Sequence, residues 1–285
     1  MFSNYLIGLR EGLEAALIVA ILIAYLVRTG NGHAITRVWQ GVAAAVLVSI
    51  GMGVMLALIE DSLGETIEPA FAGTMSLIAV GLITWMVFWM ASRAKGISAH
   101  LHGEVDRALA TSTVAVAFVA FVAVLREGAE TALFLWAGIN SAGSTAGPLL
   151  GALLGLATAV VIGVIIYRGA VKLNLGRLFT WTGAALVIVA GGVLRYAIAE
   201  FQEIGWLPGA DNVAFDVSGT FPADGIPATL VRGFFNLVPT MTWLEVVAWV
   251  LYVGITLTLF FRMIHRRGSS AKAAKQASQE SVTSR

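Results

Sequence analysis

The sequence predicts an all-α integral membrane protein with seven transmembrane helices, and three observations lead to that prediction. Hydrophobic residues make up 58% of the 285 residues and charged residues only 12%, whereas an average soluble domain has about 25% charged residues. The apolar residues gather into seven stretches, each close to the roughly 20 residues that span a bilayer. Basic residues are concentrated in alternate breaks between these stretches. The expected location is therefore the inner (plasma) membrane, with lipid as the solvent.

The seven stretches are separated by breaks that are polar or rich in turn-forming residues. They fall at residues 4–27, 38–59, 69–91, 111–139, 148–167, 179–198 and 241–264. The long connection at 204–240 contains several prolines and is expected to be an outer loop. The tail at 268–285 is rich in Ser, Ala, Lys and Gln, and we expect it to be disordered in the cytoplasm. Residues 1–267 then form a single transmembrane domain.

The distribution of basic residues predicts the orientation. The loops that follow the first, third, fifth and seventh stretches carry most of the Lys and Arg, whereas the opposite loops carry Asp and Glu and one basic residue, Arg232. The positive-inside rule then puts the N-terminus outside and the C-terminus in the cytoplasm, which requires an odd number of spans. The acidic outer loops give the outer face a negative potential that attracts cations.

One motif occurs twice. The pattern Leu-Arg-Glu-Gly-x-Glu-x-Ala-Leu is found at 9–17 and again at 125–133, in the first of three stretches each time. The first repeat covers about 1–92 and the second about 111–203. Because three crossings reverse the direction of the chain, the two repeats have opposite topology, as in many transporters. The stretch at 241–264 is then a seventh helix outside the repeats.

Both motifs place charged residues near the middle of the bilayer. At 1.5 Å per residue, their glutamates lie roughly 10 to 18 Å below the outer ends of their helices. A charged side chain at this depth costs about 2.5 to 3.5 kcal/mol on the insertion scale. These side chains must therefore face one another, water or an ion. The charged residues are Arg10, Glu11 and Glu14 in the first motif and Arg126, Glu127 and Glu130 in the second.

The charge sum of the two motifs indicates a cation site. Glutamates three residues apart share a helix face, and each arginine precedes the second glutamate by four residues and can pair with it. Four carboxylates and two guanidiniums leave two negative charges, which a metal cation balances with carboxylate oxygen ligands. Gly12 and Gly128 permit close approach of the two motif helices or a local opening of the backbone. The alternative is that each motif is a salt bridge joining helices.

Secondary sites are suggested on both sides of the membrane. We expect an outer recruitment site made of Glu65, Glu68, Glu200 and Glu203, since these lie at the outer ends of corresponding spans. His100 and His102 in a cytoplasmic loop form a candidate exit site. Met86 and Met90 are four residues apart, as in a copper(I) path, but core packing is the favoured interpretation for them.

The two motifs resemble those of the oxidase-dependent iron permeases, a family that includes the fungal high-affinity iron permeases and the bacterial EfeU-type permeases. The resemblance implies that Glu11, Glu14, Glu127 and Glu130 handle iron, with Arg10 and Arg126 beside them. It also implies an external partner that oxidises or delivers iron. Iron is then the transported substrate, no permanently bound cofactor is expected, and the chain is not an enzyme. Composition and spacing alone indicate only a hard cation.

Two other functions remain open. The chain could transport another divalent cation, such as manganese, or it could be a membrane-embedded metal oxidoreductase. Di-iron bundles typically use Glu-x-x-His and haem proteins use histidine, but all four histidines fall in predicted loops. The absence of cysteine excludes a thiolate site. The net charge of +1 gives no reason to expect a nucleic-acid partner.

Overall fold

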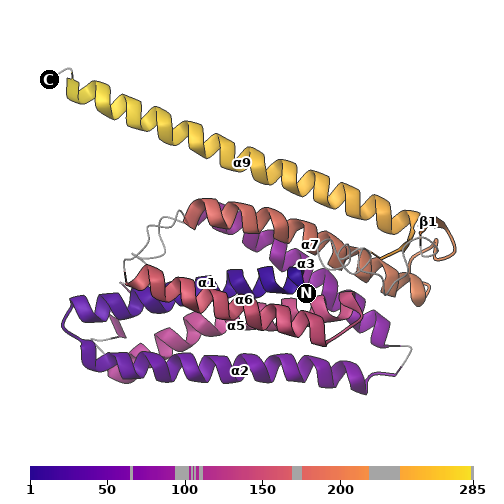
Figure 1. Cartoon of the computed structure of the whole chain (residues 1–285), viewed down its shortest axis with the longest axis horizontal. Coiled ribbons are helices and arrows are strands. Elements are labelled where there is room, and N and C mark those ends of the chain that lie inside the picture. Colours follow the sequence, from indigo (N-terminus) through magenta and orange to yellow (C-terminus); the bar gives the residue numbers. More distant parts are fainter. Residues whose placement is uncertain are drawn as a thin grey trace.

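The structure, a computed structural model of the chain, is a bundle of long helices (Figure 1). It describes residues 1–64, 67–93, 103, 105, 107–108, 112–168, 175–217 and 238–283. Its α-helices are α1 (Phe2–Arg28), α2 (Ile35–Ser62), α3 (Glu68–Arg93), α5 (Thr113–Ala142), α6 (Ala146–Tyr167), α7 (Leu175–Glu203) and α9 (Trp243–Thr283). The short 3-10 helix η1 (Gly32–Ala34) precedes α2, and the strands β1 (Val213–Asp216) and β2 (Thr240–Thr242) pair antiparallel.

Each of the seven predicted stretches corresponds to one of these helices, which confirms the all-α prediction. Within the described residues, five helices are long and apolar enough to cross a membrane: Gly32–Ser62, Glu68–Met90, Ala146–Tyr167, Gly176–Glu203 and Trp243–His265. The other two, α1 and α5, are as long but each contains the three charged residues of its motif. Some helices are longer than the predicted spans, as α7 is. The predicted spans end where the residues stop being apolar, whereas a helix ends where its terminal backbone groups find other partners.

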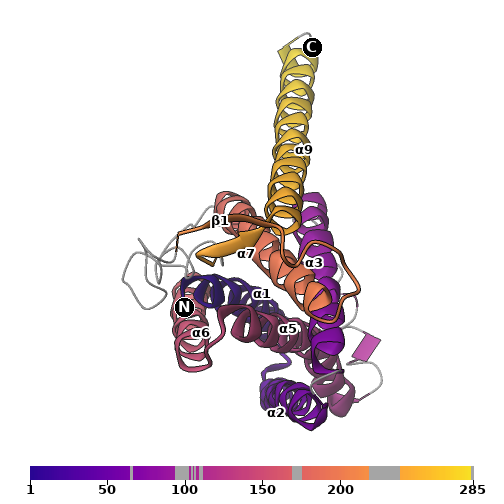
Figure 2. The same ribbon diagram turned by 90° about the vertical axis from the view of Figure 1, so that its right-hand side faces the viewer.

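Four helix pairs build the bundle. α1 packs along α6, α2 along α5, and α3 along α7, while α1 and α5 also pack against each other at the centre. α9 lies against α7 and α3, on the side of the bundle opposite α2 (Figures 1 and 2). The largest buried cluster lies among α1, α3, α5, α7 and α9 and includes Ile7, Ile83, Phe134, Leu186 and Phe260. The motif helices therefore have protein on several sides.

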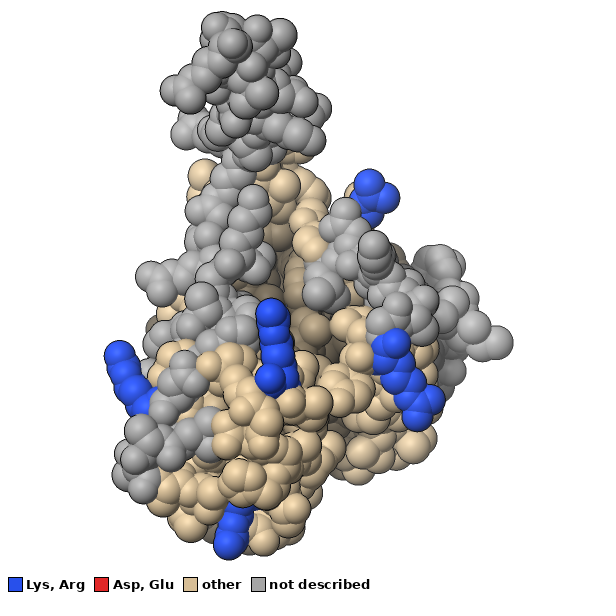
Figure 3. All heavy atoms as spheres, turned by 90° about the vertical axis from the view of Figure 1, so that its left-hand side faces the viewer, with Lys and Arg blue, Asp and Glu red and all other residues tan. Residues whose placement is uncertain are grey.

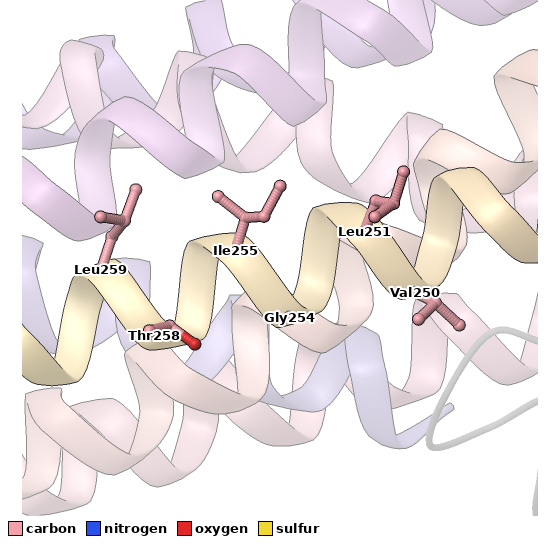
Figure 4. Close-up of a pocket in the computed structure, with 6 residues that line it drawn as sticks. All are labelled: Val250, Leu251, Gly254, Ile255, Thr258 and Leu259. Carbon is pink, nitrogen blue, oxygen red and sulfur yellow. The ribbon is translucent and has the colours of Figure 1, made fainter.

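Exposed apolar side chains cover the periphery. On α2 they include Leu47, Ile50, Met55 and Leu58. On α9 a shallow groove is lined by Val250, Leu251, Gly254, Ile255, Thr258 and Leu259 (Figure 4). Since this groove lies on the exposed face of a membrane-length helix and holds no charged residue, it fits contact with lipid and not with a metal ion.

α9 differs from the expectation of a disordered tail at 268–285, because the helix continues to Thr283. The residues after Gly268 are mainly Ala, Lys, Gln, Ser and Glu, without Gly or Pro. Most of these residues have high intrinsic helix propensity, so a helix that is already formed can extend through them. In the outer connection, β1 and β2 form a short ladder next to the start of α9 that the sequence does not predict.

Charges are separated between the two ends of the bundle. Exposed arginines gather where α1 and α6 end and where α2 and α7 begin: Arg28, Arg37, Arg168 and Arg177. Figure 3 views this end of the molecule, and the charged side chains that it colours are Lys and Arg. At the opposite ends of α2, α3 and α7 the acidic residues are Glu60, Asp61, Glu68, Glu200 and Glu203. The basic and acidic residues named here thus lie at opposite ends of the bundle, as their alternation along the sequence predicts.

Gly41 provides a test of the α2–α5 packing. A Cβ added at Gly41 of α2 would overlap the backbone carbonyl group of Ala117 on α5, whereas a Cβ at Gly51 of the same helix meets nothing within 4 Å. We expect Gly41→Ala to lower the stability of the protein by about 1 to 3 kcal/mol, as overpacking does. Gly51→Ala should be neutral or slightly stabilising, since alanine is the better helix former.

The measurement is the thermal unfolding of the detergent-solubilised variants, followed by the loss of monodisperse protein. Equal melting temperatures for Gly41→Ala and Gly51→Ala would contradict the close α2–α5 contact.

Candidate metal site

The two motif helices place three carboxylates together in the interior. Glu11 and Glu14 of α1 and Glu127 of α5 each offer one oxygen, and these oxygens all lie within 4.8 Å of one another. Glu11 is 1% exposed and Glu127 is 5% exposed. The helices bring these groups together because α1 and α5 pack against each other and their motifs lie at the contact. Carboxylates from two parts of the chain, 113 residues apart (127 − 14), thus share one site.

Several oxygens of this cluster have no hydrogen-bond donor. Both carboxylate oxygens of Glu11 are buried without a donor, as are one oxygen of Glu14, one of Glu127 and one of Glu130. A buried charged group without partners is strongly disfavoured, so such groups normally bind an ion or a donor. Oxygens from three carboxylates at this spacing are ligands that a divalent metal cation accepts.

Glu130, the fourth predicted ligand, lies at the edge of the cluster. One of its oxygens is 3.2 Å from Nε of Arg126, which donates a hydrogen bond to it. The same Nε is 3.8 Å from Glu127, and the Arg126 guanidinium carbon lies 4.9 Å from the centroid of the Trp89 ring. The Arg126 side chain is 42% exposed. It therefore neutralises the α5 carboxylates from outside the cluster.

Arg10, the corresponding residue of α1, is in a different environment. Its side chain is 1% exposed, and its Nε lies 3.3 Å from Glu14 and its Nη1 3.8 Å from Glu11. The two terminal nitrogens donate to sulfur atoms of α3, with Nη1 3.2 Å from Sδ of Met86 and Nη2 2.6 Å from Sδ of Met90. The predicted pairing within each motif is thus present in both copies, but only Arg10 is enclosed.

The motif glycines have a different role from the expected one. A Cβ at Gly12 would meet Ala159 and Leu156 of α6, and a Cβ at Gly128 would meet Ser49 of α2. Each glycine thus permits close approach to α6 or α2, and not of the two motif helices to each other. α1 and α5 also continue as helices through their motifs, so the backbone does not open there. The reason is angular: successive helix residues point about 100° apart, so the glycines face away from the glutamates.

The acidic residues at the ends of α2, α3 and α7 form a second group, which includes Glu60 in addition to described residues of the expected set. Glu60 of α2 accepts hydrogen bonds from Trp136 and Asn140 of α5. Glu200 of α7 accepts one from Tyr196, and Glu68 of α3 lies within electrostatic range of both Glu60 and Glu200. Glu203, exposed at the end of α7, also lies within electrostatic range of Glu200, and Glu65 lies outside the described residues. Sequence reasoning missed Glu60, because nothing in the sequence indicates that α5 supplies donors to it.

A buried ion pair joins two other helices. Arg195 of α7 lies 3.8 Å from Glu245, and both are buried. This pair connects α7 to α9. The candidate exit residues His100 and His102 lie outside the described residues.

Comparisons with known proteins match the chain over most of its length. The iron permease FTR1 family matches residues 1–268. The protein named ferrous iron permease EfeU from Escherichia coli O157:H7 is 37% identical over 274 residues, covering 95% of this chain and 99% of the relative. The protein of the same name from Yersinia pestis is 35% identical over 277 residues, covering 96% and 98%. No solved structure matches the chain.

The two arginines allow a matched test of charge compensation. We expect Arg10→Ala to destabilise the protein by about 3 to 5 kcal/mol, because it leaves buried carboxylates without their cation. Arg126→Ala, at the same motif position but with a side chain that is 42% exposed, should cost less because solvent screens its partners. The readout is the amount and melting temperature of folded protein, and equal effects in the two variants would contradict the difference in burial.

Proposed function

Since this chain belongs to the iron permease FTR1 family, we propose that iron crosses the membrane through the buried carboxylates of its two motifs. The chain is a multi-pass inner-membrane iron permease. The observation that carries the proposed path is the convergence of Glu11, Glu14 and Glu127, from helices of both motifs, with buried oxygens that lack donors. An intramembrane group of ionisable residues is a functional site by default.

Charge balance supports a cation as the missing partner. The four motif glutamates and two arginines sum to two negative charges if all are ionised, and Arg126 contributes from a half-exposed position. A divalent ion would bring this sum to zero while binding the converging oxygens of Glu11, Glu14 and Glu127. The same cluster without the ion would be tolerated because Arg10 is held beside Glu11 and Glu14.

The helix contacts support an inverted repeat of α1–α2–α3 and α5–α6–α7, with α9 added. Exchanging α1 with α5, α2 with α6, and α3 with α7 turns the α1–α6 contact into the α5–α2 contact. The same exchange swaps the two members of the α3–α7 pair and of the α1–α5 pair, so these contacts remain the same. Transport sites commonly lie where two such repeats meet, and α1 and α5 meet at the carboxylates.

The charged ends support an N-terminus outside and a C-terminus in the cytoplasm. Iron then enters from the acidic end of the bundle, where Glu60, Glu68 and Glu200 precede the motif carboxylates and take the place of the outer recruitment site. An external iron-binding protein that delivers ferrous iron would meet this end. Inward movement is favoured by the membrane potential, by about 2.3 kcal/mol per elementary charge per 100 mV.

The proposed cargo is ferrous iron. The E. coli and Y. pestis relatives are named ferrous iron permeases, and carboxylate oxygens accept divalent first-row metals in general. Because manganese is the nearest competitor by ligand chemistry, uptake into proteoliposomes is best measured with radiolabelled iron under reductant, with and without manganese. Iron uptake that a small excess of manganese abolishes would favour the broader divalent-cation transporter.

The carboxylate path is tested by removing one charge at a time. Glu14→Gln and Glu130→Gln keep the side-chain size but remove a ligand oxygen charge, and we expect iron uptake to fall at least roughly tenfold, since changes near metal ligands cost about 10- to 100-fold in affinity. Asp211→Asn, which removes an exposed acidic residue in the outer connection, is the control. Full uptake in both Glu variants, with normal amounts of folded protein, would remove the cluster from the path.

The outer group is tested by kinetics. Glu68→Gln combined with Glu200→Gln should raise the half-saturating iron concentration more than it lowers the maximum rate, because these residues concentrate iron before the rate-limiting passage. Asp211→Asn, an exposed residue in the connection between α7 and α9 that is not part of this group, should have a smaller effect. A loss of maximum rate at unchanged half-saturation would place these carboxylates in a later step.

A further inference from the structure

Two methionines complete the surroundings of Arg10. Met86 and Met90 lie one turn apart on α3, both are buried, and both sulfurs accept from the Arg10 guanidinium. The opposite side of the same guanidinium faces Glu14 and Glu11. A single positive group is therefore surrounded by two carboxylates from α1 and two thioethers from α3.

We propose that the space held by the Arg10 guanidinium is a metal position, and that Met86 and Met90 supply thioether ligands there for ferrous iron. Iron takes this position when Arg10 moves aside. The inference rests on the proposed function, because it assumes that iron passes the motif carboxylates. It adds two ligands of a different chemical class to a site that otherwise consists of oxygen.

The chemistry of the donors gives the site a preference. Thioether sulfur is a soft ligand, whereas calcium, magnesium and manganese favour oxygen. Carboxylates alone bind all of these ions, so they do not distinguish iron from the far more abundant hard cations. Sulfur beside the carboxylates favours ferrous iron over those ions, and it also favours ferrous over ferric iron, because the ferric ion is the harder of the two.

The hydrogen bonds from Arg10 to Met86 and Met90 are weak, which supports a ligand role for the two methionines. Thioether sulfur is a poor hydrogen-bond acceptor, so two methionines are an unfavourable choice if their purpose is only to hold a buried guanidinium. Arg10 Nε is ion-paired with Glu14 but makes no hydrogen bond, and several cluster oxygens also lack hydrogen bonds. The enclosed arginine is therefore held by ion pairs and by weak hydrogen bonds to sulfur, and a metal ion would bind the same oxygen and sulfur ligands more strongly.

The second motif indicates where the arginine can go. Arg126 occupies the same motif position as Arg10, but its side chain is 42% exposed and lies over Trp89. It still donates to Glu130 from there. An arginine at this motif position can thus stay paired with its own helix while leaving the inner side of the carboxylates free. Arg10 in such a position would uncover Met86 and Met90.

The alternative is a packing role, since Met86 belongs to the large buried cluster around α3 and α7. X-ray absorption at the iron edge separates the two. Purified full-length protein is loaded with ferrous iron under reductant, and the iron–sulfur scattering is measured. Because the chain contains no cysteine, a sulfur shell can come only from methionine. We expect a mixed oxygen and sulfur shell that Met86→Leu combined with Met90→Leu converts to oxygen and nitrogen alone.

Transport gives the second readout. Met-to-Leu changes conserve volume, so the double variant should fold, and its half-saturating ferrous concentration should rise by at least roughly tenfold, as for other disturbed metal sites. Inhibition by manganese and calcium should become stronger by a similar factor. The control is Met52→Leu combined with Met55→Leu, two exposed methionines of α2, which should change neither quantity.

The outcomes separate this inference from the function on which it rests. Iron bound by oxygen alone in the unaltered protein, or unchanged metal selectivity in the double variant, would overturn the thioether role and leave the carboxylate path intact. Failure of the unaltered protein to bind or transport ferrous iron would overturn the proposed function itself. If the double variant does not fold, the spectrum of the unaltered protein still decides the question.

Discussion

The structure depends on compensating charges that cannot be solvated. Six ionisable residues of the two motifs lie on helices that pack at the centre of the bundle, where three of the carboxylates come within 4.8 Å of one another. Like charges at this spacing repel strongly in a medium of low dielectric constant, and only cations can offset the repulsion. The two arginines partly do so, and the remaining negative charge is the physical basis of the proposed metal path.

This constraint also explains the packing around the motifs. Glutamates that face the centre leave the neighbouring motif glycine facing α6 or α2, and a glycine there lets those helices approach closely. Close packing excludes lipid from the charged face and fixes the positions of the carboxylates. The peripheral helices α2 and α9 can then expose apolar side chains to lipid without any part in the site.

The two arginines show that equivalent motifs are not in equivalent states. Arg10 is enclosed between carboxylates and thioethers, whereas Arg126 lies over an aromatic ring with much of its side chain exposed. The proposed movement of Arg10 would carry it from the enclosed arrangement to one like that of Arg126, which stays paired with Glu130 on its own helix.

Local sequence determined the helices and the identity of the charged groups. Apolar runs bounded by polar breaks specify membrane-length helices, and the duplicated motif identifies which helices carry charge and on which face. Only the tertiary structure decided the partners: Met86 of α3 for Arg10, and Trp136 of α5 for Glu60, are each 76 residues away in the chain. Helical periodicity defines the face on which a residue lies, but the partner that meets that face depends on how the helices pack.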